Sequence, residues 1–98
     1  MSNYTLRITE SAKLDIQEAY DWYELQKADL GFDLMEELSD CLVFLSENPE
    51  SLQIVYNEKR RMLCKRFPYA IYFEINKMEV VVIAVTHTSR HPRWWKKR

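Results

Sequence analysis

The residues with the clearest chemical potential lie together at the end of the chain. Residues 87–98 hold two imidazoles, two indoles and five cationic side chains. Basic residues interleaved with aromatic ones suit single-stranded nucleic acid, because bases stack on indoles while cations follow the phosphates. The alternative is that Trp94 or Trp95 folds back as an apolar clamp over the helical hairpin that is predicted below for residues 9–47, while the lysines only solubilise the end. Both interpretations remain open on the sequence.

Metal-free cleavage of RNA is one reaction that these residue types could perform. It needs a base for the 2′-hydroxyl, a cation for the charge that develops on the phosphate, and an acid for the leaving oxygen. His87 or His91 could transfer the protons. The candidate catalytic residues, none of them firm, are His87, Arg90, His91 and Arg66, and the cation could also come from Arg61, Lys65 or Arg93.

Other kinds of site have less support. His87 and His91 would need further ligands and a helix to hold a metal, and Pro92 opposes that helix, so no metal is expected. Ser89 lies near His91 but lacks the glycine-rich elbow of a nucleophilic serine. The lone Gly31 excludes a glycine-rich phosphate loop, and we expect no cofactor.

The net charge of −1 conceals a strong segregation of charge. Met1–Glu58 carries thirteen acids and three bases, whereas Lys59–Arg98 carries eleven bases and two acids. A partner of negative potential would be steered to the second part of the chain. Alternatively, the two parts complement each other within one fold.

Residues 60–87 are expected to form a three-stranded antiparallel meander. Arg61–Phe67 is its first strand, and Tyr69–Ile75 alternates between two faces as a second strand should. Glu79–Thr86 contains the run VVVIAV, which is typical of a strand buried on both faces. Asn76-Lys77 lies between the last two strands and is predicted to be their hairpin turn.

Residues 1–47 must supply the cover that such a meander needs. Tyr4–Ile8 alternates as a strand, and two amphipathic helices follow within residues 9–47. Thr9 is expected to cap the first helix, and Gly31 to give the joint between the helices its φ freedom. Asn48-Pro49 should end the second helix, because the residue before proline avoids the α region.

These elements predict one α+β domain of 98 residues with helices on one face of a mostly antiparallel sheet. Cys41 and Cys64 are interpreted as reduced thiols, and neither a signal peptide nor a membrane span is evident. We therefore expect a cytoplasmic protein that does not enter the membrane. The predicted order is an N-terminal strand (1–8), an antiparallel helical hairpin (9–47), a loop (50–58), the meander (60–87) and a basic aromatic tail (88–98).

Four segments resemble toxins of the RelE/ParE superfamily, the toxic half of type II toxin–antitoxin modules. They read TESAKLDIQEAYDWY, LSENPES, RRMLCKRFPYAIYFEI and VVVIAVTHTSRHPRWW, and together they span nearly the whole chain. The resemblance implies a helical hairpin packed on an antiparallel sheet. It also implies a bacterial plasmid-stabilisation type of module, in which the free toxin arrests growth and a cognate antitoxin neutralises it in a hetero-oligomer; a homo-oligomer is also possible.

The branches of this superfamily differ in target. The RelE-like branch cleaves mRNA on the ribosome, whereas the ParE-like branch inhibits DNA gyrase without a nuclease site. His87, Arg90, Pro92 and Trp94 match the H-x-x-R-x-P-x-W ending of the ParE-like branch, and Ala70 stands where the nuclease branch has an arginine. The resemblance thus favours a gyrase inhibitor over an endonuclease, with an inactive antitoxin-binding module as a third reading. The expected target-binding residues are Arg61, Lys65, Arg66, His87, Arg90, Arg93, Trp94 and Trp95.

Overall fold

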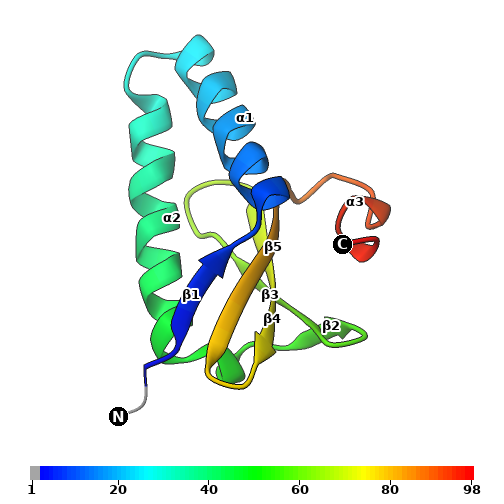
Figure 1. The fold of residues 1–98 in the computed structure, drawn as a ribbon. Helices are drawn as coiled ribbons and strands as arrows, with labels where there is room; N and C mark the ends of the chain where they lie inside the picture. Colours follow the sequence, from blue (N-terminus) through cyan, green and yellow to red (C-terminus); the bar gives the residue numbers. More distant parts are fainter. Residues whose placement is uncertain (1–2) are drawn as a thin grey trace.

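A single mixed sheet organises the part of the chain that the computed structural model describes, residues 3–98 (Figure 1). Its five strands lie in the order β1-β5-β4-β3-β2. Residues 1 and 2 of the predicted N-terminal strand segment lie outside the described residues. The elements are β1 (Thr5–Ile8), α1 (Glu10–Gln26), α2 (Leu30–Glu47), the 3₁₀ turn η1 (Pro49–Ser51), β2 (Ile54–Tyr56), β3 (Lys59–Leu63), β4 (Tyr69–Asn76), β5 (Glu79–His87) and α3 (Arg93–Lys96).

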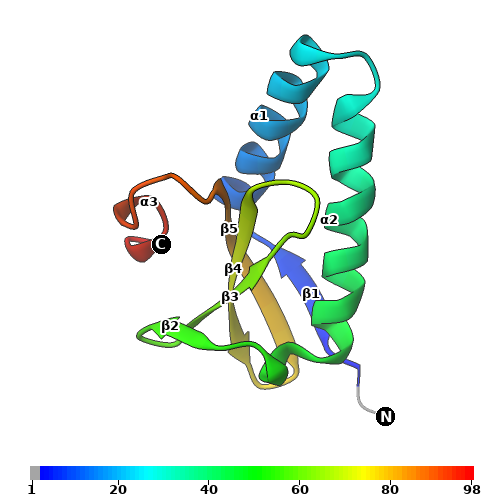
Figure 2. The ribbon, with the colours of Figure 1, turned by 180° about the vertical axis from the view of Figure 1, so that it is seen from behind.

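The two long helices pack on one side of this sheet, and α3 lies on the other (Figures 1 and 2). The helical hairpin carries the chain back so that β1 pairs in parallel with β5, while the other neighbouring strands are antiparallel. The predicted α+β architecture is therefore confirmed. Neither long helix combines the length and the apolar character that a bilayer crossing requires, nor does any other helix within residues 3–98.

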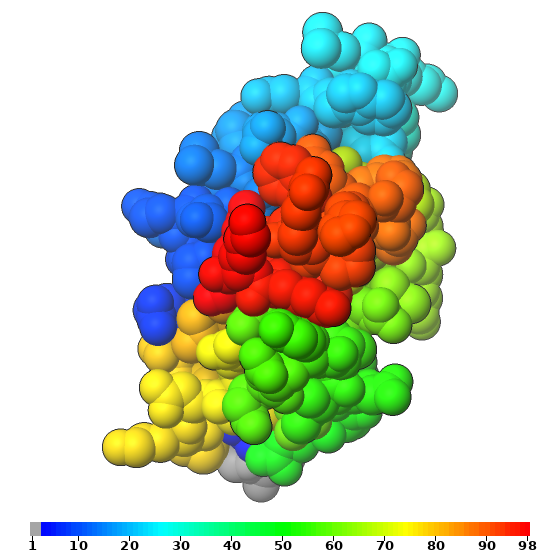
Figure 3. All heavy atoms as spheres, turned by 90° about the vertical axis from the view of Figure 1, so that its right-hand side faces the viewer, coloured from blue at the N-terminus to red at the C-terminus, as the bar shows by residue number. Residues whose placement is uncertain are grey.

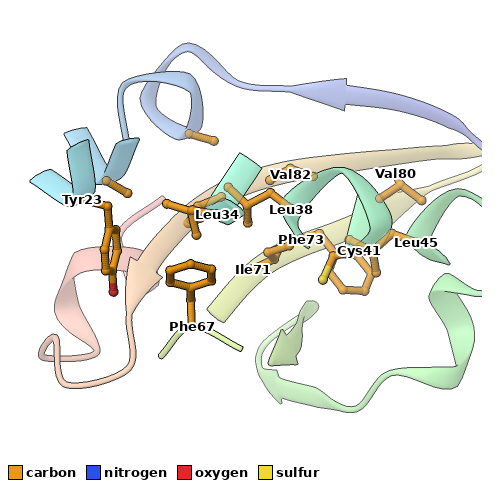
Figure 4. Packing of buried hydrophobic residues seen from close by; sticks show 13 residues of the cluster. Tyr23, Leu34, Leu38, Cys41, Leu45, Phe67, Ile71, Phe73, Val80 and Val82 are labelled. Atoms are coloured by element: carbon orange, nitrogen blue, oxygen red, sulfur yellow. The ribbon is translucent and has the colours of Figure 1, made fainter. Parts of the chain in front are cut away.

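The central strands are buried on both faces, as the run VVVIAV predicts. Tyr72 pairs with Ala84 and Phe73 with Val82, so Ile83 is the extra residue of a β-bulge. The bulge turns Ile83 and Ala84 to the same face. Figure 4 shows the helix-facing cluster, where Leu34, Leu38, Cys41 and Leu45 of α2 meet Ile71, Phe73, Val80 and Val82 of the sheet.

The helix joint differs from the prediction. Thr9 caps α1 as expected, its hydroxyl accepting from the Ala12 amide at 3.2 Å. The positive φ of the joint belongs to Asp29, at 72°, and not to Gly31. Gly31 is needed for space, because a Cβ there would lie 2.8 Å from side-chain atoms of Tyr20 and Glu24. A Glu24 oxygen accepts from the Gly31 amide at 2.7 Å and so satisfies an amide in the first turn of α2.

The hairpin turn lies one residue later than predicted. Asn76 pairs with Glu79, so Lys77 and Met78 form the turn. Lys77 adopts a φ of 58°, a conformation that costs a residue with a Cβ about 1 kcal/mol. The pairing of β4 with β5 therefore sets the position of the turn, although Asn76 tolerates a positive φ better than Lys77 does.

The segment predicted as a loop at 50–58 also differs. It contains the end of η1 and the short edge strand β2, which pairs with β3 through an irregular register. The first meander strand was placed too late in the chain, because β3 ends at Leu63 and residues 64–68 form a loop. β2 was not predicted because a strand of three residues shows too little alternation to be recognised from sequence.

Glu37 of α2 holds that loop. Its side chain is buried, and its carboxylate accepts from the amides of Lys65, Arg66 and Phe67 at 2.5, 2.8 and 3.1 Å. Three consecutive amides converging on one anion form a strong, charge-assisted contact. Sequence reasoning missed this role, although a glutamate between the apolar positions of a helix was its signal.

Replacing Glu37 with alanine should destabilise the fold, because the buried Phe67 amide and the partly buried amides of Lys65 and Arg66 would lose their acceptor. We expect the free energy of unfolding in urea to fall by about 2–4 kcal/mol. The matched control is Glu36→Ala, which removes an exposed carboxylate from the same turn and should change stability by less than about 0.5 kcal/mol. Equal stabilities of the two variants would contradict the role of Glu37.

Cys41 and Cys64 are free thiols at the interface of α2 and the loop. Burial, with a smaller effect of the neighbouring Cys41, raises the pKa of Cys64 to about 12. Burial likewise raises the pKa of Cys41. Since the thiolate is the reactive form, both groups should be inert in the folded chain.

Both thiols should therefore resist an aromatic disulfide reagent at pH 8 and react once urea unfolds the chain. In the unfolded chain Cys64 has its ordinary pKa of 9.0, whereas in the folded chain its pKa is about 12. The stability conferred by the neutral thiol should thus be complete below pH 9 and be lost as the pH rises from 9 to 12. A Cys64→Ala variant should lose this part of the pH dependence. Labelling of the folded chain at its unfolded rate would refute the prediction.

Candidate functional site

The tail folds back onto the sheet face that the helices leave open. Trp95 is 5% exposed and stacks on Tyr72 of β4, with ring centroids 4.1 Å apart and planes 12° apart. The predicted apolar clamp is therefore found for Trp95, but on the sheet and not over the helical hairpin. Figure 3 shows the tail, in orange and red, lying between α1 in blue and the β2–β3 region in green. Trp95 joins a second apolar cluster with Ala70, Tyr72, Val81, Ile83 and Ala84.

An ion pair fastens the far end of the tail. The guanidinium of Arg98 binds both carboxylate oxygens of Asp15 on α1, with Nη2 lying 3.2 Å from Oδ1. Arg98 also donates to the carbonyl of Ile83 at 3.2 Å, and the Val85 amide donates to Asp15 at 3.0 Å. Asp15 is buried, and its position among the apolar residues of α1 was a sequence signal that we missed. The tail is thus part of the folded structure.

A pocket of about 530 Å³ opens between α1 and the ends of β4 and β5. It collects His87, Ser89 and Arg90 beside the ring of Tyr69, which meets the imidazole edge-on at 5.5 Å. Burial raises the pKa of Tyr69, so its phenol stays neutral. The opposite wall comes from α1. The full lining is Asp15, Glu18, Ala19, Trp22, Tyr23, Tyr69, Val85, Thr86, His87, Ser89 and Arg90.

His87 is oriented by its own turn. Its Nδ1 accepts from the Ser89 amide at 3.1 Å and lies 2.8 Å from the Ser89 hydroxyl. A neutral imidazole that accepts at Nδ1 carries its proton on Nε2. Ser89 therefore positions the histidine through two contacts at Nδ1, one from its backbone amide and one from its hydroxyl.

The remaining catalytic candidates lie elsewhere. Arg66 is in the loop held by Glu37, 4.0 Å from Asp33 of α2, and does not line the pocket. His91 is exposed in the tail, where its Nδ1 accepts from the Arg93 amide at 3.2 Å. The structure thus brings together His87 and Arg90 but neither Arg66 nor His91.

The predicted target-binding residues divide between two surfaces. Arg90, Arg93 and Trp94 are exposed on the tail, and the Arg90 guanidinium lies 4.4 Å from the centre of the Trp94 ring. Arg61 pairs with Tyr72 and faces the same side of the sheet as Trp95. Lys65 and Arg66 lie in the loop beside α2. Trp95 is buried, so its predicted role in contacting a target gives way to holding the tail.

Metal-binding arrangements do not occur in the part of the chain that the structure describes. No three histidine, cysteine, aspartate or glutamate side chains of residues 3–98 gather closely enough to hold an ion. The groups available in the pocket are an imidazole, a phenol, a guanidinium and carboxylates. These can exchange protons or bind a charged or aromatic group.

Comparisons with known proteins agree with this architecture. The chain is similar to a protein of the chromosomal ParDE toxin–antitoxin system of P. aeruginosa, with a TM-score of 0.78 and 15% identity over 86% of this chain and 95% of that one. It is also similar to a chain of the toxin–antitoxin complex RelBE2 from Mycobacterium tuberculosis, with a TM-score of 0.66 and 19% identity over 89% of this chain and 93% of that one. At these identities, the likenesses show the fold.

No curated protein matches the sequence. A family model does match, and it is described as the ParE toxin of the type II toxin–antitoxin system parDE. The match covers residues 6–92 and therefore includes both long helices, His87, Arg90 and all of the sheet except Thr5. The chain belongs to the ParE toxin family of type II toxin–antitoxin systems.

Proposed function

We propose that this ParE-family toxin acts by binding DNA gyrase in the cytoplasm, and that a cognate antitoxin neutralises it. The observation that carries the proposal is the construction of the tail. Trp95 and Arg98 fix it against the sheet and α1, which leaves Arg90, Arg93 and Trp94 exposed on a rigid base. Exposed Trp and Arg side chains on a preorganised surface are typical of the residues that dominate protein interfaces.

The chemistry of the open sheet face supports binding over cleavage. Its centre is filled by apolar side chains around Trp95. The Lys59 ammonium beside it is paired with Glu74 at 3.3 Å. The imidazole of His87 lies at the pocket and not at the centre of this face. Gyrase as the target rests on the ParE-like ending of the tail, and an antitoxin partner is supported by the two similar toxin–antitoxin systems.

A second candidate function is metal-free RNA cleavage at the pocket. The observation in its favour is the meeting of three suitable groups, His87 and neutral Tyr69 for the proton transfers and Arg90 as the cation. General acid–base catalysis needs such groups within hydrogen-bonding reach of one substrate. Arg66 and His91 have no part in this version of the site, since neither lines the pocket.

Purified toxin should inhibit supercoiling by gyrase, and addition of the antitoxin encoded beside it should restore supercoiling. Arg90→Ala and Trp94→Ala should each raise the half-inhibitory concentration by about tenfold or more, as loss of a central interface residue does. Lys97→Ala is the matched control, because it removes an exposed cation from the same tail. Thermal unfolding of each variant would show that the fold persists.

Point variants test this better than deletion of the tail. A chain ending at Ser89 would lose Trp95 and leave Asp15 buried without its ion-pair partner. Undiminished inhibition by the double variant Arg90→Ala, Trp94→Ala would contradict the proposed surface. Failure of the intact toxin to inhibit gyrase would contradict the target.

Pulse labelling after induction separates the two candidate functions. Gyrase inhibition predicts that DNA synthesis falls before protein synthesis, in wild type and in a His87→Ala, His91→Ala variant alike. RNA cleavage predicts the opposite order, and its rate should fall about 10²-fold or more in His87→Ala, the range expected for loss of a group that transfers a proton. His91→Ala is then the internal control, because His91 lies outside the pocket.

A further inference from the structure

The wall of the pocket on α1 differs in chemistry from the tail that faces it. Glu18 and Trp22 line the pocket from α1, and Trp22 is 54% exposed. Among residues 3–98, no lysine, arginine or histidine forms an ion pair with Glu18. Tyr23 and Tyr69 complete an aromatic surround. A carboxylate beside aromatic faces attracts a cation, by charge and through the ring electrons.

Arg90, the cation of the pocket lining, does not pair with Glu18. The Arg90 guanidinium lies over the Trp94 ring on the tail. His87 accepts a hydrogen bond at Nδ1 from the Ser89 amide, so this nitrogen is engaged within its own turn. The Asp15 carboxylate is already bound to Arg98 and the Val85 amide. Glu18 is therefore the acid that a ligand could engage.

An apolar stripe continues from the pocket along the outside of α1. Leu14, Trp22 and Leu25 are 64, 54 and 83% exposed. With Glu18 they recur at helical spacing along one side of the helix. A helix surface that combines exposed apolar side chains with an unpaired acid fits an amphipathic segment of another protein.

The charge around the stripe selects the partner. Residues 10–47 hold eleven acids and only two lysines. Three of these acids are used inside the fold, namely Asp15, Glu24 and Glu37, and most of the others are exposed. Such a surface repels nucleic acid and acidic peptides and attracts a basic segment.

We infer that the pocket and the Leu14–Leu25 stripe form a docking surface for a basic, apolar segment of a partner protein. An arginine or lysine of that segment enters the pocket between Trp22 and Tyr69 and pairs with Glu18. Its apolar neighbours cover Leu14, Trp22 and Leu25. The inference rests on the proposed function only in taking the partner to be a protein. Its surface meets the proposed gyrase-binding surface at Arg90 but does not include Arg93 or Trp94.

The test uses two synthetic peptides and the purified toxin. Acetyl-Leu-Arg-Leu-amide is titrated into the labelled protein while NMR follows the Trp22 indole and the Glu18 side chain. The matched peptide replaces arginine with citrulline, which keeps the shape and removes the charge. Glu18→Gln is compared with Asp21→Asn, because both remove one exposed acid from α1 and Asp21 does not line the pocket.

The arginine peptide should shift both signals, and the citrulline peptide should not. Glu18→Gln should raise the dissociation constant by about fivefold, and Asp21→Asn by less than about twofold. Equal binding of both peptides, equal effects of both substitutions, or no shift at millimolar peptide would overturn the inference. Shifts produced by raising the toxin concentration alone would show that a second copy fills the pocket, which would overturn the assignment to a different protein.

None of these readouts depends on supercoiling. A toxin that fails to inhibit gyrase but binds the arginine peptide through Glu18 would lose its proposed target and keep its docking surface. A toxin that inhibits gyrase but does not bind the peptide would keep its proposed target and lose its docking surface. The two proposals can therefore fail separately.

Discussion

A central strand that is apolar on both faces must be covered on both, and this requirement shapes the whole molecule. The residues of β5 from Val80 to Val85 are all buried. The helical hairpin covers one face, and Trp95 stacked on Tyr72 covers the middle of the other. Burial of a side chain of this size contributes about 1.5–3 kcal/mol. A short segment near the end of the chain thereby becomes a structural element.

Much of this arrangement could be predicted from the sequence. The alternation in β4, the unbroken apolar run in β5 and the amphipathic helices identify the architecture, because each period is set by the geometry of its element. The cap at Thr9 was likewise predictable from the residue type. What failed was the placement of the hairpin turn and of β2, since strand pairing decided the first and β2 is too short to show a period.

The site was less predictable, because its defining contacts join distant residues. Asp15 meets Arg98 across 83 positions of sequence, and Glu37 binds amides 28–30 residues away. Nothing local in the sequence distinguishes these two acids from their exposed neighbours, except that they interrupt an apolar face. Residue types alone grouped His91 and Arg66 with His87, whereas the fold separates them.

Contacts between residues that are distant in sequence also explain part of the segregated charge of the chain. The pairs Asp15–Arg98 and Asp33–Arg66 join the acidic and basic parts, so some of the charge is complementary within the fold. Glu24 and Glu37 instead accept hydrogen bonds from backbone amides, so no basic residue has to balance their charges. Most of the exposed acids that remain lie on α1 and α2, while Arg90, Arg93 and Lys96 lie on the tail. Because the tail is fixed to the sheet, these two charged surfaces keep a constant relation to each other. One rigid molecule can therefore present an acidic face and a basic face to different partners at once.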